Sequence, residues 1–567
     1  MSPAEAQQPE GPAPSGKPSP PTRKDRGGRG AFLVAAGILF SRLFGFIRAR
    51  VFAHYFGNSV AAAAFQAALR IPNFLQNLFG EGVLSASFIP VYAKLLGRGD
   101  PDEADRVAGA VFGLLSLVTG LLVLAGIFCA PLLVDVIAGG FSESSRALTI
   151  QLVRILFPAT GLLVYSAWCL GILNSHRRFF LSYAAPVIWN TAQIVALIVF
   201  GRRADLDHLA KVLAWAVVVG SALQFGVQVP RVLSLLGRFR PSLDVFRPTV
   251  RTVLRGFGPV VVGRGVVQLS AYVDTFYASL ISERAFSTLA YAQLLYLLPV
   301  SLFGMSVSAA ELPEMSRAGG SAEEVAAKLR ERVDGGLRRI AFFVIPSVTA
   351  LFFLGDVAGG AILQTGHFRP DDTRLLWYLI MGATVGLLAS TSGRLYSSAF
   401  YALHDTKTPL YFSILRVTLT AVLAYWSVTQ LPGLLGVPRE LGAVGITGTT
   451  GVAAWVEYEL LRHTLGKRIG RTGLPAGTAT RLWAGALVAS GFGIAVKLLL
   501  VHRFGAAPLA LIAWGGHLLP APAMRAWIAA PLVFVPFGVA YFGVTALLGV
   551  PEAQALLKRV LRRRAGR

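Results

Sequence analysis

The stretch from residue 41 to residue 90 decides the fold, and it reads SRLFGFIRARVFAHYFGNSVAAAAFQAALRIPNFLQNLFGEGVLSASFIP. It places arginines and a glutamate inside two segments that are otherwise apolar enough to span a bilayer. A charged side chain near the bilayer centre costs at least about 2.5 to 3.5 kcal/mol, so we expect such residues to face a wet cavity or to pair with one another. The candidate site residues that follow from this argument are Arg42, Arg48, Arg70 and Glu81.

The composition of the chain predicts a membrane protein built from helices. Hydrophobic residues make up 54% of the 567 residues and charged residues 14%. The mean hydropathy is +0.60, and apolar runs of helical length recur from Ala31 to the C-terminal end. No soluble interval is long enough to bury a core of its own. The predicted fold class is therefore an all-α polytopic membrane protein.

Fourteen apolar segments come close to the roughly 20 residues that a bilayer core demands, and they predict fourteen transmembrane helices. An even number of spans places both termini on the same side of the membrane. Residues 1–30 are rich in Pro, Gly, Ser and charge, which predicts a disordered cytoplasmic tail. The predicted spans are 31–56, 65–97, 106–134, 148–174, 179–201, 209–233, 250–281, 286–316, 337–364, 374–403, 408–430, 440–464, 479–501 and 526–549.

The basic residues alternate along the chain between clusters and sparse loops. Clusters such as Lys94 with Arg98 and Arg177 with Arg178 fall in every second connecting segment. These segments hold about three times as many basic residues as the intervening loops. This distribution follows the positive-inside rule, which places both termini in the cytoplasm. The net charge of +24 is therefore explained by the topology of the chain in the membrane. Because this charge needs no nucleic-acid partner to explain it, we exclude one.

Two pairs of segments indicate an internal repeat. Residues 171–190 resemble residues 399–418, and Pro72 and Pro299 occupy matching places in the second and eighth predicted spans, about 227 residues apart. Two six-helix lobes in pseudo-repeat, with an added helix pair, account for this pattern, and transporters built from repeats bind substrate near the midplane between the lobes. The predicted units are the lobes 31–235 and 250–465, the helix pair 479–549 and a basic cytoplasmic tail 550–567.

Motifs for catalysis or metal binding are missing from the sequence. The eight histidines show no HExxH spacing, and the chain has neither a P-loop nor a nucleophile elbow. Cys129 and Cys169 both fall inside predicted helices, which is typical of small buried thiols. We therefore expect no enzyme activity, no bound cofactor and no metal.

At SRLFGFIR, at AFQAALRIPNFLQNLFGEGVLSASFIPVY and at FYALHDTKTP the sequence resembles the MurJ (MviN) family of lipid II flippases, in the multidrug/oligosaccharidyl-lipid/polysaccharide (MOP) exporter superfamily. The match spans residues 31 to 549. It implies a V-shaped pair of lobes that carry undecaprenyl-diphosphate-linked peptidoglycan precursor across the bacterial inner membrane by alternating access. It also implies membrane lipids and cell-wall synthesis proteins as partners, and a role in cell shape.

The resemblance carries over to the candidate residues one by one. Arg42 and Arg48 match the two arginines of the family's first helix, Arg70 matches a cation of its second helix, and Glu81 matches the acid of its EG pair. Three of them have an alternative role. Arg48 can reach the headgroups, Arg70 can anchor its helix, and Glu81 can be the counter-ion of Arg42 or Arg48.

Three departures separate this chain from the family pattern. The alanine run 61–64 stands where relatives have an aspartate, Gln76 and Asn77 stand where they have an arginine pair, and Gln293 with Leu294 replaces their eighth-helix motif, so its arginine is missing. A diphosphate needs several cations, and guanidinium fits phosphate oxygens best. Arg264 of the seventh predicted helix is the candidate replacement, and its alternative is snorkelling to the cytoplasmic surface.

Two acids complete the candidate set. Asp274 lies deep in an apolar run, which suggests coupling to a sodium or proton gradient or to the membrane potential. Asp405 at the HDTKTP turn is a second candidate for cation coupling, although its position favours a helix N-cap. Two other functions stay open from the sequence: transport of another polyprenol-linked glycan or a small cationic solute, and a non-transporting scaffold for cell-wall assembly.

Overall fold

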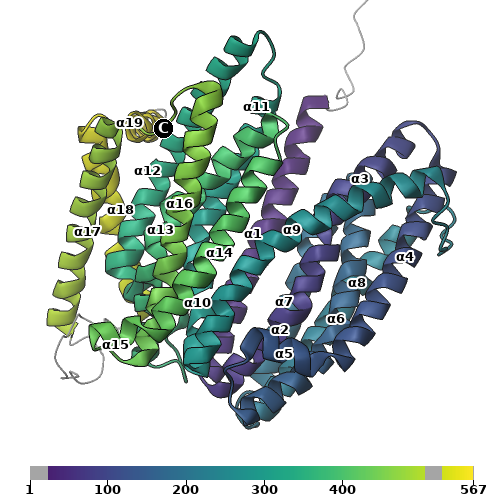
Figure 1. Ribbon diagram of the computed structural model, residues 1–567, viewed down its shortest axis with the longest axis horizontal. Coiled ribbons are helices and arrows are strands. Elements are labelled where there is room, and N and C mark those ends of the chain that lie inside the picture. The colour runs from purple at the N-terminus through teal and green to yellow at the C-terminus, as the bar shows by residue number, and fades with distance from the viewer. Residues whose placement is uncertain (1–22, 505–525, 566–567) are drawn as a thin grey trace, which may run out of the picture.

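The computed structural model describes residues 23–504 and 526–565, and within these ranges the regular structure is entirely helical (Figure 1). Ten helical segments are long and apolar enough to cross a membrane, which confirms the predicted class. The other four predicted spans coincide with α1, the α2–α3 pair, α9 and α16, which are not among these ten, so the total of fourteen stays a prediction. The ten segments are Pro101–Phe128, Glu143–Ser175, Phe179–Phe200, Leu206–Leu233, Glu283–Ser316, Ala322–Leu363, Pro370–Ala402, Lys407–Thr429, Ala476–His502 and Ala526–Leu547.

The first lobe consists of the first eight helices. α1 begins at Arg23, inside the segment 1–30 that the sequence predicts as a tail, and residues 1–22 lie outside the described residues. Gly80 breaks the second predicted span into α2 and α3, because its extended backbone cannot continue a helix. The helices are α1 (Arg23–Phe56), α2 (Val60–Phe79), α3 (Glu81–Gly97), α4 (Pro101–Phe128), α5 (Ala130–Ala138), α6 (Glu143–Ser175), α7 (Phe179–Phe200) and α8 (Leu206–Leu233).

The second lobe repeats this arrangement, and an additional pair of helices packs on it. The pair contacts α12, where the Lys497 ammonium lies 2.6 Å from the Asp356 carboxylate. The elements of the lobe are α9 (Pro248–Ile281), α10 (Glu283–Pro299), the π-helical segment η1 (Val300–Met305), α11 (Ser306–Ser316), α12 (Ala322–Leu363), α13 (Pro370–Ala402), α14 (Lys407–Thr429), α15 (Leu431–Leu435), the 3₁₀ turn η2 (Arg439–Leu441) and α16 (Gly442–Ile469). The remaining helices are α17 (Ala476–Phe504), α18 (Ala526–Leu547) and α19 (Pro551–Ala565).

The backbone of two turns confirms the repeat in detail. Arg177 and His404, in the α6–α7 and α13–α14 turns, both have left-handed backbones, with φ of 58° and 59°. Each turn closes with the same hydrogen bond, from Arg178 N to Leu173 O and from Asp405 N to a carbonyl in the last turn of α13, at 2.8 and 2.9 Å. These bonds satisfy the last carbonyls of a helix in the manner of a Schellman cap. The matching residues are again about 227 apart.

Helix α9 connects the two lobes along its length (Figure 1). Near its start Thr249 donates a hydrogen bond to Glu103 of α4, and the ring of Phe257 lies 5.9 Å from that of Phe79. Near its end Asp274 accepts a hydrogen bond from Thr450 of α16. The predicted boundary at residue 250 therefore separates the lobes in sequence, whereas in space the first half of α9 packs against the first lobe.

The lobes meet at one end, where two left-handed glycines face each other. Gly57 has φ of +56° and Gly366 has φ of +55°. The Gly57 carbonyl accepts a hydrogen bond from the Tyr291 hydroxyl at 2.8 Å, and His367 N donates to His54 O at 2.9 Å. A Cβ at either glycine would collide with a backbone carbonyl of the other lobe. Toward the opposite end the lobes diverge (Figure 1).

Gly57→Val should open this junction. A β-branched residue with positive φ is strained by roughly 1 to 2 kcal/mol, and here it also meets the His367 carbonyl. We expect the ratio of separated to closed lobes to rise at least about tenfold, because about 1.4 kcal/mol changes an equilibrium constant by a factor of ten. Spin labels on the exposed residues Ser144 and Asp371 would report the separation as a distance distribution.

Gly436→Val is the matched control. Gly436 has a comparable φ of +62°, and nothing lies within 4 Å of the Cβ that it would gain. This variant carries the same backbone strain without touching the junction. Equal distance distributions for the wild type and Gly57→Val would show that the glycine contact does not hold the lobes together.

Candidate functional site

Arg42 of α1 reaches from the first lobe to the second. Its Nη1 donates to the Ser301 hydroxyl at 3.1 Å. Ser301 belongs to η1, the π-helical segment that follows Pro299. Proline removes a backbone hydrogen bond, and π-helical segments occur frequently at functional sites. Arg42 therefore contacts an irregular point of the opposite lobe.

Arg48 and Arg70 are held by neutral groups. The Arg48 guanidinium lies 4.7 Å from the centre of the Trp189 ring and donates to Gln193 Oε1 at 3.3 Å. Arg70 donates to the Gln293 side chain at 2.5 Å and to the Thr275 hydroxyl at 3.0 Å, so it also reaches the second lobe.

None of these three arginines has a carboxylate partner within 4 Å among the residues that the structure describes. Hydrogen bonds and a cation–π contact partly offset the cost of burying these cations, but no carboxylate neutralises them. Guanidinium groups held by amide and hydroxyl oxygens keep their full positive charge for an anion from outside. The three arginines are consequently the positive side of a candidate anion site.

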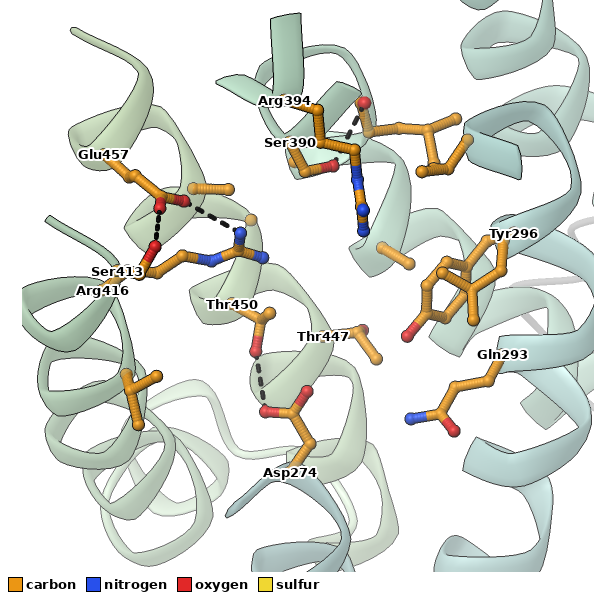
Figure 2. A pocket seen from close by; sticks show the side chains of 18 residues that line it. Asp274, Gln293, Tyr296, Ser390, Arg394, Ser413, Arg416, Thr447, Thr450 and Glu457 are labelled. Atoms are coloured by element: carbon orange, nitrogen blue, oxygen red, sulfur yellow. Dashed lines mark hydrogen bonds and ion pairs between the residues drawn. The ribbon is translucent and has the colours of Figure 1, made fainter. Parts of the chain in front are cut away.

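The second lobe contains a charged pocket with a volume of about 260 Å³, called here the second-lobe pocket (Figure 2). It is lined by residues of α9, α10, η1, α13, α14 and α16. Arg416 lies 3.0 Å from Glu457, which also accepts a hydrogen bond from Ser413 at 2.8 Å. Arg394 points into the same pocket (Figure 2). Within the described residues Arg394 has neither an ion pair nor a side-chain hydrogen bond.

Asp274 occupies the other end of the second-lobe pocket (Figure 2). Its side chain is buried, with 6% of the residue surface exposed, and it accepts a hydrogen bond from the Thr450 hydroxyl at 2.9 Å. No group of three His, Cys, Asp or Glu side chains with a metal-binding arrangement exists among the described residues. The side chains of Asp274, Thr447 and Thr450, each of which carries oxygen, line this end of the pocket.

Two of the three first-lobe arginines, Arg42 and Arg70, contact residues that line the second-lobe pocket or are adjacent to its lining. Ser301, the partner of Arg42, is adjacent to the lining residue Val300. Gln293, the partner of Arg70, lines the pocket itself. Arg48, in contrast, contacts only Trp189 and Gln193 of α7, in its own lobe.

Asp405 does not belong to this region. Its carboxylate accepts hydrogen bonds from Lys407 N and Thr408 N, each at 3.0 Å, and lies 2.7 Å from the Arg468 guanidinium. The bonds from Thr408 lower the pKa of Asp405 to about 2. Asp405 thus satisfies backbone N–H groups of the first turn of α14 from one residue before the N-cap position, Thr406, and its role in cation coupling stays a prediction.

Two predicted site residues cannot be placed. The side chains of Glu81 and Arg264 lie outside the part of the chain that the structure describes, although both residues belong to helices. Sequence analysis missed Arg394, Arg416 and Glu457. Their signal was present, because each is a charged residue within an apolar helix.

Comparisons with known proteins identify the family of this chain. The profile of the family described as "Lipid II flippase MurJ" matches residues 52–513. A probable lipid II flippase MurJ from Rhizobium meliloti (strain 1021) is 31% identical over 490 residues, which cover 84% of this chain and 88% of that protein. The chain belongs to the MurJ family.

Further relatives of this MurJ family member are similar over most of their length. Lipid II flippase MurJ from Burkholderia cenocepacia is 32% identical over 448 residues, covering 77% of this chain and 84% of that protein. A solved structure titled "Lipid II flippase MurJ, inward closed conformation" has a TM-score of 0.71 at 21% identity, covering 93% of this chain and all of that one. An inward-facing MATE transporter of the MOP superfamily has a TM-score of 0.60 at 17% identity, covering 77% of this chain and 98% of that one. This likeness supports the fold of two lobes.

Glu457→Gln should destabilise this MurJ family member. The change leaves Arg416 without its counter-charge, and because the pair is only partly buried we expect a loss of about 1 to 3 kcal/mol. Glu459→Gln is the control on the same helix, since its pair with Arg462 is exposed and is worth below about 1 kcal/mol. Thermal unfolding in detergent would compare the midpoints. Equal midpoints for both variants would show that Glu457 does not stabilise Arg416.

Proposed function

We propose that this chain is a flippase that moves lipid II, an undecaprenyl-diphosphate-linked peptidoglycan precursor, from the cytoplasmic to the periplasmic leaflet of the bacterial inner membrane. The observation that carries the proposal is a set of arginines without counter-charges, two of which, Arg42 and Arg70, reach from the first lobe to the second. Arg42, Arg48, Arg70 and Arg394 have no carboxylate partner among the described residues. The membership of the MurJ family, whose relatives are named lipid II flippases, supports the choice of cargo.

The basic residues support an inward-facing orientation. Lys94, Arg178 and Arg468 lie at the ends of helices, in connections that the positive-inside rule assigns to the cytoplasm. The junction of Gly57 with the loop around Gly366 lies at the other ends of the helices. With both termini in the cytoplasm, the lobes are closed toward the periplasm and diverge toward the cytoplasm.

The diphosphate couples cargo to the movement of the lobes. A ligand shifts a conformational equilibrium only through different affinities for the two states. Arginines from one lobe alone would bind the diphosphate in much the same way in either state. Arg394 on the second lobe adds contacts that depend on how the lobes sit, so the occupied and empty proteins favour different states. This cycle needs neither a bound cofactor nor a covalent intermediate.

Several partners follow from this function. The lipid-linked precursor is the cargo, membrane lipids surround the spans, and cell-wall synthesis proteins are the source and destination of the precursor. A small cationic solute fits poorly, because it would meet uncompensated arginines.

Asp274 supplies the coupling to a gradient. Its buried carboxylate, beside the hydroxyls of Thr447 and Thr450, offers oxygen ligands to sodium or a site for one proton. Asp274→Asn should therefore remove the dependence of flipping on an imposed sodium or proton gradient in reconstituted vesicles. Asp207→Asn, which changes an exposed acid of α8, should leave it intact. The same gradient dependence in Asp274→Asn and the wild type would reject coupling through this residue.

Depletion of the protein in its host tests the function. Lipid II should accumulate in the cytoplasmic leaflet, and a different polyprenol-linked glycan would identify another cargo.

Complementation of the depleted host by variants of the protein then tests the site. Arg42→Ala and Arg394→Ala should each lower flipping by about tenfold to a hundredfold, since a hydrogen-bonded charge contributes roughly 1.5 to 3 kcal/mol. Arg98→Ala removes an exposed arginine from the turn after α3 and serves as the control. Full complementation by either site variant at normal abundance would show that its arginine does not contact the cargo.

A further inference from the structure

A second polar pocket lies inside the first lobe, between α1, α2, α6, α7 and α8, and is called here the first-lobe pocket. Its volume is about 350 Å³, within the usual range for ligand sites of roughly 300 to 1,000 Å³. The amide side chains of Asn73, Gln76 and Asn77 line one side of it. Its described lining residues include no Asp, Glu, Lys, Arg or His.

The first-lobe and second-lobe pockets occupy equivalent places in the repeat. At the separation of about 227 residues that relates the lobes, Ala167 corresponds to Arg394 and Trp189 to Arg416. The same backbone framework thus surrounds a neutral pocket in one lobe and a charged pocket in the other. The cation positions of the second-lobe pocket are occupied by a methyl group and an indole ring in the first.

Three polar atoms of the first-lobe pocket are buried without a hydrogen-bond partner in the described part of the chain. They are Ser182 Oγ, Trp189 Nε1 and Asn190 Oδ1. Ser182 is 2% exposed and Asn190 is 5% exposed. An unpaired buried polar group costs roughly 1 to 3 kcal/mol, so three in one pocket indicate that a ligand or water completes them.

We propose that the first-lobe pocket binds the uncharged saccharide of the lipid-linked cargo, an inference that rests on the proposed function. A hydroxyl, an indole N–H and an amide oxygen together offer donors and acceptors, which is what sugar hydroxyls and acetamido groups require. A pocket without charge favours such a group over a phosphate or a peptide carboxylate.

The position of Arg48 connects this subsite to the diphosphate. Its guanidinium lies over the ring of Trp189, whose edge nitrogen is one of the three unpaired atoms. A diphosphate held at Arg48 leaves its attached sugar next to the pocket. Gln76 and Asn77 line this pocket with uncharged amides and keep its surface neutral.

The test measures the affinity of full-length protein in lipid nanodiscs for two probes. One is undecaprenyl diphosphate, and the other is the same lipid carrying a disaccharide without a peptide. Asn190→Leu and Ser182→Ala should each weaken binding of the disaccharide lipid by about tenfold, which is the effect of losing one buried hydrogen bond. Binding of undecaprenyl diphosphate should change by less than about twofold, since the pocket does not contact phosphate.

Two controls separate binding from folding. Thr191→Val changes the residue next to Asn190, but its hydroxyl bonds to Val187 O and it does not line the pocket, so both affinities should stay as in the wild type. Ser182→Ala removes an unpaired hydroxyl, so the melting temperature without ligand should be equal or higher. A lower melting temperature together with equal losses for both probes would indicate a structural role and overturn the proposal.

The outcomes also separate this inference from the proposed function. If wild-type protein binds neither probe, the proposed function fails. If it binds undecaprenyl diphosphate and the disaccharide adds no affinity, only the saccharide subsite fails and the pocket holds water alone. Unchanged disaccharide affinity in both variants would likewise overturn the subsite.

Discussion

The structure depends on arginines that have no counter-charge among the residues that it describes. An isolated cation in hydrocarbon is too costly to persist, so Arg42, Arg48 and Arg70 require either water or an anionic ligand around them. In the structure, Arg42 and Arg70 reach hydroxyl and amide groups of the second lobe, whereas Arg48 is held by Trp189 and Gln193 of its own lobe. In the proposed function, the anion bound by these arginines becomes part of the energetics of lobe movement.

The internal repeat gives two pockets with one geometry and opposite chemistry. In the second lobe Arg394, Arg416, Glu457 and Asp274 make the pocket ionic, whereas the equivalent pocket of the first lobe is neutral. This asymmetry suits a cargo whose parts differ in charge, because a symmetric pair would bind the same group twice.

The fold was predictable from the sequence, as were three of the arginines in the candidate site. Charges in apolar runs identified Arg42, Arg48 and Arg70, and matching segments identified the repeat that the turns at Arg177 and His404 confirm. The pocket around Arg394 was missed because the direction of a side chain around its helix depends on packing partners, which a single segment does not specify. The crossing of α9 between the lobes and the π-helical segment after Pro299 likewise depend on tertiary contacts.

The central claim is that arginines of both lobes hold the diphosphate of the cargo at once. A cryo-electron microscopy structure of the protein in nanodiscs with bound lipid-linked precursor tests it most directly. The account predicts diphosphate density within hydrogen-bond reach of the guanidinium groups of Arg42 or Arg48 on one lobe and of Arg394 on the other. Diphosphate density that contacts only one lobe, or that lies outside the interface of the lobes, would contradict it.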